Sequence, residues 1–243
     1  MATRAISDAS TAASDAGPLP GTVPQGRAFD PGCAACPRLA RFLVEQRTAL
    51  PGYHNAPVPA FGDNGARLLV VGLAPGLHGA NRTGRPFTGD HAGILLYQTL
   101  FDHGFASASV SEHTSDGLRL IDARISNAVR CVPPENKPVP DEVRRCNAYL
   151  AHDLAAHPAE GVVIALGTIA HQAVLDALGL RRAAYGFGHG ARHMLPDGRL
   201  LLDSYHCSRY NTSTRRLTPE MFAAVFAAAR AHLGSTPPDR VCA

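Results

Sequence analysis

Four short, strongly apolar segments separated by segments with helical periodicity are the feature that most constrains the fold. The apolar segments cover residues 67–73, 124–130, 161–167 and 199–205. Each is short and rich in branched aliphatic side chains, which is typical of a buried strand. Strands that alternate with helices form a mostly parallel sheet between two helix layers. We therefore predict an α/β protein with three α/β/α layers around a mostly parallel, four-stranded sheet.

Helical spacing of apolar residues fills the intervals between these strands. It occurs around residues 94–100, 143–154, 169–178 and 218–233, and the last of these begins with Thr218-Pro219-Glu220. Threonine as the capping residue followed by proline in the first turn is a common helix start. In sheets of this kind, ligands bind beyond the carboxyl ends of the strands. The unusual polar residues of this chain fall at those ends.

The two ends of the chain differ in composition from its centre. Residues 1–25 are mainly small or polar and cannot bury enough apolar surface to offset chain entropy, and residues 235–243 are similar. We therefore expect disordered tails on either side of one domain over residues 26–234. No apolar run approaches the length of a membrane span, and no secretory signal is visible. A cytoplasmic protein is expected, and its net charge of +3 does not by itself mark a nucleic-acid binder.

Six cysteines in a chain without a secretory signal favour metal binding or catalysis over disulfides. Cys33 and Cys36 form a C-x-x-C pair, Cys131 ends the second strand, and Cys146 lies on the helix that follows it. Four such thiolates suit zinc or an iron–sulfur cluster, and their spacing does not separate the two. The alternative is a set of scattered buried cysteines, and Cys207 and Cys242 are left over in either case.

The loops that follow the first strand carry candidate ligand-binding groups. Gly72-Leu-Ala-Pro-Gly76 allows close approach of backbone N–H groups to a ligand, although a plain tight turn explains the same residues. Further along, Phe87 lies in a loop where an aromatic ring could stack on a base. Asp90 follows it and precedes a helix, so it is either a carboxylate that polarises water or a helix cap.

Two other strand ends carry polar groups. Asn127 lies in an otherwise apolar strand, where its amide either recognises a base edge or makes a structural hydrogen bond. His206 follows the fourth strand and begins a stretch, residues 206–216, that holds three arginines and several hydroxyl residues but no acid. A basic, small-polar loop of this kind suits contact with phosphates.

Together these segments resemble the uracil-DNA glycosylase superfamily, and within it family 5, the iron–sulfur type b branch. The resemblance covers roughly residues 30–233. It rests on the joint order of the four cysteines, Gly72–Gly76, residues 84–90, residues 126–131, residues 165–168, and His206 with Ser208, Arg209, Asn211 and Thr212.

The resemblance implies a [4Fe–4S] cluster on Cys33, Cys36, Cys131 and Cys146, with a structural role. The related family 4 has an acidic residue in the first glycine motif, where this chain has Ala74. Family 5 shares that departure and places its catalytic carboxylate at the position of Asp90. This assigns the catalytic carboxylate to Asp90, which also remains suited to capping the helix.

The resemblance also assigns roles in base excision. Phe87 would stack on a flipped base, Asn127 would pair with its edge, and His206 would donate to the departing base. Backbone groups of Gly72, Ala74 and Gly76 would line the pocket. Ser208, Arg209 and Asn211 would contact DNA that contains uracil or another deaminated base such as hypoxanthine. A monomer that works at the prokaryotic nucleoid is expected.

The basic residues are 22 arginines and Lys137, which lies in a proline-rich loop. Imine-forming lyase glycosylases need an amine with a lowered pKa, and nothing in this loop indicates one. We therefore predict a monofunctional hydrolase. The alternatives are a zinc- or iron–sulfur-stabilised nucleic-acid-binding module without chemistry and a homologue that traps abasic or uracil sites. A dinucleotide-binding enzyme is disfavoured, since Gly72-x-x-x-Gly76 is not G-x-G-x-x-G.

Overall fold

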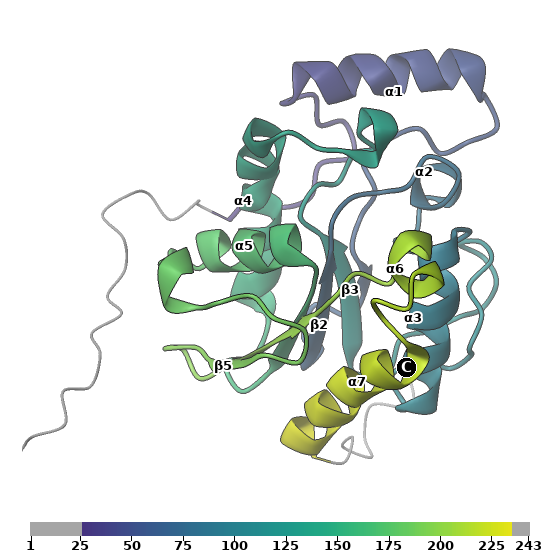
Figure 1. Cartoon of the computed structure of the whole chain (residues 1–243). Coiled ribbons are helices and arrows are strands. Elements are labelled where there is room, and N and C mark those ends of the chain that lie inside the picture. Colours follow the sequence, from purple (N-terminus) through teal and green to yellow (C-terminus); the bar gives the residue numbers. More distant parts are fainter. Residues whose placement is uncertain (1–25, 235–243) are drawn as a thin grey trace, which may run out of the picture.

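A computed structural model of the chain describes residues 26–234, which form a sheet with helices on both faces (Figure 1). The two predicted tails, residues 1–25 and 235–243, lie outside the described residues. Within residues 26–234, no helix is long and apolar enough to cross a membrane.

The sheet has six strands in the order β1-β3-β2-β4-β6-β5. Their bounds are β1 Phe61–Gly62, β2 Leu68–Gly72, β3 Ala123–Asn127, β4 Val162–Leu166, β5 Arg192–Met194 and β6 Leu200–Ser204. The four central strands are parallel, and β1 and β5 pair antiparallel at the two edges. The prediction of a four-stranded sheet is therefore wrong in strand number, although the parallel centre consists of the four predicted strands.

The edge strands escaped prediction because they carry no usable pattern. β1 is two residues long, and β5 is Arg-His-Met with its arginine and methionine exposed. A strand must be longer than this before an apolar alternation can be recognised. Both are joined to the sheet by backbone hydrogen bonds, which depend little on side-chain type.

Seven α-helices are described. They are α1 Pro37–Ala49, α2 Ala80–Thr83, α3 His91–Asp102, α4 Pro140–Ala156, α5 Thr168–Ala177, α6 Arg209–Ser213 and α7 Pro219–Leu233, with 3-10 turns η1 Pro134–Asn136 and η2 Arg182–Ala184. The four predicted helices are α3, α4, α5 and α7. As predicted, Thr218 caps α7, with its hydroxyl accepting from the Met221 N–H at 3.2 Å.

Alternation along the strands supplies the two cores. Leu68 and Val70 of β2 face one side with α3 and α7, while Leu69 and Val71 face the other side with α4 and α5 (Figure 1). The three predicted layers are therefore present. A third, smaller core joins α1 to the amino-terminal half of α4 and to the segment after β3, and the four predicted cysteine ligands lie in or against it.

Candidate active site

A cavity of about 450 Å³ opens where the carboxyl ends of β2 and β3 meet the segment that follows β6. It brings together Asp90, Asn127 and His206, which are separated by up to 116 residues in the chain. Its lining residues are Leu73, Ala74, Gly76, Ala80, Phe87, Asp90, His91, Ala92, Asn127, Asn136, His206, Ser208 and Arg209. Of the site residues predicted around this cavity, Gly72 and Asn211 are not among those that line it.

Asn127 ends β3 and presents an unsatisfied acceptor. The residue is 3% exposed, and its Oδ1 atom is buried without any hydrogen-bond partner in the described structure. A buried carbonyl oxygen without a partner costs roughly 1–3 kcal/mol. Because Asn127 also lines the cavity, a ligand N–H is the group that would satisfy this oxygen.

Asp90 both caps α3 and faces the cavity. Its Oδ1 accepts from the Gly93 N–H at 3.0 Å, so the helix-cap interpretation is correct in geometry. The second oxygen, Oδ2, lies so close to the backbone of Gly79 that a Cβ there would sit 2.4 Å from it. Burial raises the pKa of Asp90, while the N–H groups of Gly93 and Ala92 favour its charged form. Asp90 thus caps the helix with Oδ1 and leaves Oδ2 available to a ligand.

Phe87 lies over the end of β2. Its ring packs against Gly72, where a Cβ would come within 2.5 Å of Phe87 Cζ and within 2.4 Å of Asn127 Oδ1. The backbone of Phe87 has φ of 54°, in the left-handed region that is unfavourable for an aromatic residue. A strained residue of this kind persists only where the surroundings enforce it.

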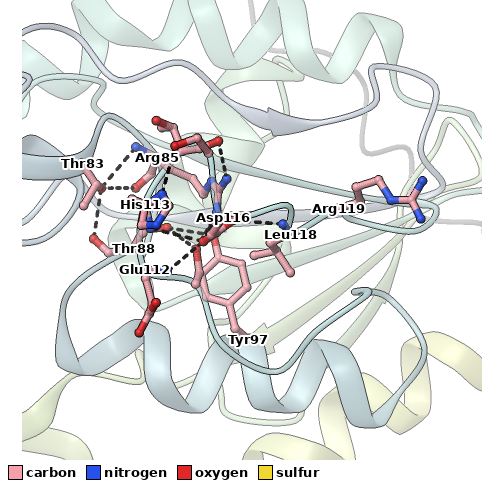
Figure 2. Close-up of polar contacts among 12 residues, drawn as sticks. Thr83, Arg85, Thr88, Tyr97, Glu112, His113, Asp116, Leu118 and Arg119 are labelled. Carbon is pink, nitrogen blue, oxygen red and sulfur yellow. Dashed lines mark hydrogen bonds and ion pairs between the residues drawn. The ribbon is translucent and has the colours of Figure 1, made fainter.

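A polar network anchored by Arg85 enforces this conformation (Figure 2). Arg85 is 4% exposed, and its Nη1 donates to both oxygens of Asp116 at 2.8 Å. Two further hydrogen bonds flank Phe87: Tyr97 Oη donates to the Pro86 carbonyl at 2.7 Å, and the Thr88 hydroxyl lies 2.7 Å from that of Ser111. The loop that carries Phe87 is therefore tied to residues 111–116 before any ligand arrives.

Asp116 is held as a carboxylate in this network. Burial opposes its charge, but hydrogen bonds from the Leu118 N–H and from Arg85 outweigh that effect and hold its pKa well below the usual value. Arg85 is further covered by the ring of Phe61, with Cζ 4.5 Å from the ring centroid. The network is thus a charged pair whose donors and acceptors are largely satisfied.

His206 follows β6 and lies beside Phe87, with the ring centroids 5.9 Å apart and the planes 26° from parallel. Burial lowers the pKa of His206 to about 4, so the ring is neutral at physiological pH. A neutral imidazole has one N–H donor and one acceptor. It can therefore donate a hydrogen bond into the cavity without carrying charge there.

The predicted DNA-contact residues take different positions. Ser208 caps α6, and the Asn211 side chain donates to the carbonyl of His206 at 2.8 Å. Asn211 thus fixes the backbone of His206, which is a positioning contact. Arg209 is exposed at the rim of the cavity and forms no ion pair within residues 26–234.

The four predicted cysteine ligands line a second cavity, together with Leu39, Val129, Tyr149 and others. Cys33 and Cys36 are half-buried, Cys131 and Cys146 are buried, and all four are free thiols. Burial raises the pKa of Cys146 to about 11 and also raises that of Cys131. Without a bound cation Cys131 and Cys146 are therefore protonated at neutral pH, and a cation held by them would convert them to thiolates.

The comparisons with known proteins agree with this arrangement. A model of the uracil DNA glycosylase superfamily matches residues 59–230. The chain belongs to the uracil DNA glycosylase superfamily. It is 49% identical over 203 residues to a type-5 uracil-DNA glycosylase of Thermus thermophilus, covering 82% of this chain and 92% of that protein. It is 40% identical over 206 residues to a type-5 enzyme of Pyrobaculum aerophilum, covering 83% and 89%. A type-4 uracil-DNA glycosylase of Archaeoglobus fulgidus matches over a shorter stretch, at 36% identity over 125 residues, 51% of this chain and 54% of that one.

Sequence reasoning missed several residues that shape the site of this superfamily member. Gly79 makes room for the Asp90 carboxylate, and Asn136 lines the cavity from the η1 turn. His91 lies beside Asp90, and its Nε2 is 3.0 Å from the hydroxyl of Thr212, which joins α3 to α6. The spacing Gly72, Gly76, Gly79 was a usable signal for close packing, whereas the partners of Arg85 and His91 are too distant in sequence to be inferred.

Proposed function

We propose that this chain is a uracil-DNA glycosylase, a monofunctional enzyme that flips uracil out of DNA and hydrolyses its N-glycosidic bond. The observation that carries the proposal is the unpaired, buried Oδ1 of Asn127 in one cavity with Asp90 and His206. An acceptor, a carboxylate and a neutral donor are the groups that excision of a base with a ring N–H requires. The similarity to two type-5 uracil-DNA glycosylases supports the same activity.

Base choice follows from Asn127. Uracil carries an N–H at ring position 3, flanked by two carbonyl oxygens, whereas cytosine has an acceptor at that position. Asn127 Oδ1 would accept this N–H, and binding would remove the cost of its unsatisfied state. Phe87, fixed by the Arg85 network, would stack on the extruded ring.

Bond cleavage follows from the other two side chains. As the bond between C1′ of the sugar and N1 of uracil breaks, the sugar becomes cationic and the base leaves as an anion. The Asp90 carboxylate would stabilise the sugar cation and orient the water whose oxygen forms the new bond to C1′, and the proton that this water loses would neutralise the uracil anion. The neutral ring of His206 would donate a hydrogen bond to the anionic base, and its low pKa keeps it uncharged in the resting enzyme.

The four cysteines fit a [4Fe–4S] cluster better than a single zinc ion. In residues 26–234 the one trio of candidate ligand atoms within 4.8 Å of one another is His171, His193 and Asp203, so no three cysteine sulfurs come this close. Tetrahedral zinc would place its four sulfurs about 3.8 Å apart, given Zn–S bonds of about 2.3 Å. The wider spacing supports Cys33, Cys36, Cys131 and Cys146 as cluster ligands.

Such a cluster would supply structure to this chain, because no redox step is needed for hydrolysis. It would join the segment before α1 to α4 and to the end of β3. The N–H of Arg130 already donates to Cys146 Sγ at 3.2 Å, a contact that would orient the sulfur as a ligand.

Hydrolysis without an imine intermediate also fits Lys137. Its side chain is 81% exposed and lies 3.7 Å from the carboxylate of Glu135. Lys137 does not line the cavity of Asp90, Asn127 and His206, so its amine is poorly placed to attack C1′. We further propose that the protein acts as a monomer on DNA at the nucleoid, in the cytoplasm of a prokaryotic cell.

The experiment is excision from oligonucleotides that carry one uracil, using the full chain and an Asp90→Asn variant. Free uracil and an alkali-labile, otherwise intact strand are expected from the wild type, with a large loss in the variant. Tight binding to the uracil-containing oligonucleotide without release of the base would indicate a nucleic-acid-binding module. A covalent protein–DNA complex would indicate a trapping homologue, and strand cleavage without alkali would contradict the monofunctional mechanism.

Hypoxanthine is the further substrate that we propose. Like uracil, it presents a ring N–H beside a carbonyl, so the same Asn127 acceptor would serve both bases. Oligonucleotides that carry hypoxanthine in place of uracil test this, with Asn127→Ala expected to weaken excision of both. Cluster content is tested separately by iron and sulfide analysis and by visible absorption of the protein and of a Cys131→Ser variant.

A further inference from the structure

Three metal-ligating side chains converge at a place that the excision reaction does not use. Asp203 lies on β6 and is fully buried, His171 lies on α5, and His193 lies on edge strand β5. One ligand atom from each comes within 4.8 Å of the others. None of the three lines the cavity of Asp90, Asn127 and His206.

Both ring nitrogens of His171 face oxygen acceptors. Nδ1 lies 2.7 Å from Oδ1 of Asp203, and Nε2 lies 3.0 Å from the carbonyl of Tyr185. A neutral imidazole has a single N–H, so it can satisfy only one of these contacts. If Nε2 donates to the carbonyl, the lone pair of Nδ1 points at the carboxylate. Both contacts are satisfied together when a cation, either a second proton or a metal ion, lies at Nδ1.

The surroundings of this trio suit a metal ion. Nε2 of His193 also converges on Asp203, at 3.3 Å from Oδ2, so three potential ligand atoms meet at this point. Metal-bound histidines commonly donate their other ring N–H to a backbone carbonyl, which is the contact that His171 makes with Tyr185. Two imidazole nitrogens and one carboxylate oxygen form a ligand set that suits zinc, with water as a fourth ligand.

Access and enclosure fit the same interpretation. The side chain of His193 is 16% exposed while those of His171 and Asp203 are buried, so an ion could enter past His193. The ring of Phe187 packs edge-on against His171, with centroids 5.7 Å apart. An apolar wall of this kind limits solvent access and strengthens metal–ligand attraction.

We propose that His171, His193 and Asp203 bind one zinc ion, which fastens edge strand β5 to β6. Strand β6 leads within two residues of its end to His206, so the ion would stabilise the segment that carries a catalytic group. The site is independent of the four-cysteine site and of the excision reaction, and its failure would leave both proposals intact.

The test is zinc retention by the full chain, purified with its cysteine site loaded, after dialysis against zinc and then against metal-free buffer. The comparison is between the wild type, His193→Gln and the matched control His232→Gln, which alters an exposed histidine on α7. We expect one more retained zinc ion in the wild type and in the control than in His193→Gln. Because only the folded chain binds the ion, zinc should also raise the melting temperature of these two and not of His193→Gln.

Cobalt(II) in place of zinc gives a second measurement that does not depend on the variant. Nitrogen and oxygen ligands give cobalt its weak visible bands without the intense sulfur-to-metal absorption that cysteine ligands produce. Cobalt bands of the nitrogen–oxygen type, lost in His193→Gln, support the proposal. Equal zinc retention in wild type and His193→Gln, or cobalt bands with sulfur character alone, would overturn it. The absence of retained zinc together with a doubly protonated His171 ring in NMR spectra would show that a proton occupies the position.

Discussion

The ring of Phe87 lies so close to Gly72 that a single methyl group on Gly72 would come within 2.5 Å of Phe87 Cζ. The same methyl group would lie 2.4 Å from Oδ1 of Asn127, so the missing side chain of Gly72 leaves the space that the stacking ring and the base-reading amide both occupy. Real Cβ atoms do not make contacts this short, so both side chains would have to move. Because the Arg85 network restrains Phe87, the displacement would fall on the geometry of the site.

Gly72→Ala is therefore expected to reduce kcat/KM for uracil excision by about 100-fold, the cost of a displacement of about 1 Å in a site of this kind. The matched control is Gly186→Ala, which alters an exposed glycine whose Cβ would meet nothing within 4 Å. Single-turnover excision rates of the two variants measure the difference. Equal rates in Gly72→Ala and the wild type would show that Phe87 and Asn127 do not act on the base.

Asp90 is expected to have two separable roles. Asp90→Asn keeps an oxygen that can accept from the Gly93 N–H, whereas Asp90→Ala removes this cap and should cost about 1 kcal/mol of stability. Both variants lose the negative charge, so both should lose on the order of 100-fold or more in excision rate. Chemical denaturation and single-turnover kinetics measure the two effects.

The control for the cap is Thr218→Ala, which removes the side-chain cap of α7. It should lower stability by a similar amount and leave the excision rate unchanged. If Asp90→Asn kept full activity, the carboxylate would be a helix cap only.

The sequence was informative where a single segment carries its own signal. The four parallel strands were predictable from their branched apolar residues, although β3 contains only Ile125. Asn127 and His206 stood out as polar residues at strand ends, whereas Asp90 was assigned a catalytic role only through the family resemblance. The pairing of Arg85 with Asp116 was not predictable, because it joins residues 31 positions apart with no local periodicity. The unsatisfied state of Asn127 Oδ1 was also beyond prediction, as it depends on which partners the fold leaves out of reach.

His206 is expected to make stability fall in acid. Its pKa is about 4 in the folded protein against an ordinary value near 6.5, so the unfolded chain binds more protons between these two pH values. The contribution of the neutral His206 ring to the free energy of unfolding is therefore fully present above about pH 6.5. It is lost as the pH falls toward 4, and its maximum is about 3 kcal/mol. His206→Gln should show a smaller loss of unfolding free energy than the wild type between pH 6.5 and 4.5.

His157 is the internal reference for this measurement. Burial also lowers its pKa to about 4, and it lies outside the active-site cavity. His157→Gln should flatten the acid dependence of stability while retaining excision, whereas His206→Gln should flatten it and lose excision. An acid dependence that neither variant alters would contradict the buried, neutral state of both rings.

Arg209 is expected to contribute affinity for DNA without contributing base choice. It is exposed at the rim of the cavity and has no carboxylate partner among residues 26–234, so its guanidinium is available to a phosphate. Each such contact releases a condensed counterion on binding. Arg209→Ala should therefore weaken binding to uracil-containing and undamaged duplexes alike, and should reduce the slope of log Kd against log salt by about 1.

Arg181→Ala, which alters another exposed arginine, is the control and should leave the slope unchanged. A variant that lost discrimination between uracil and thymine, with an unaltered salt slope, would place Arg209 on the base instead of the phosphate.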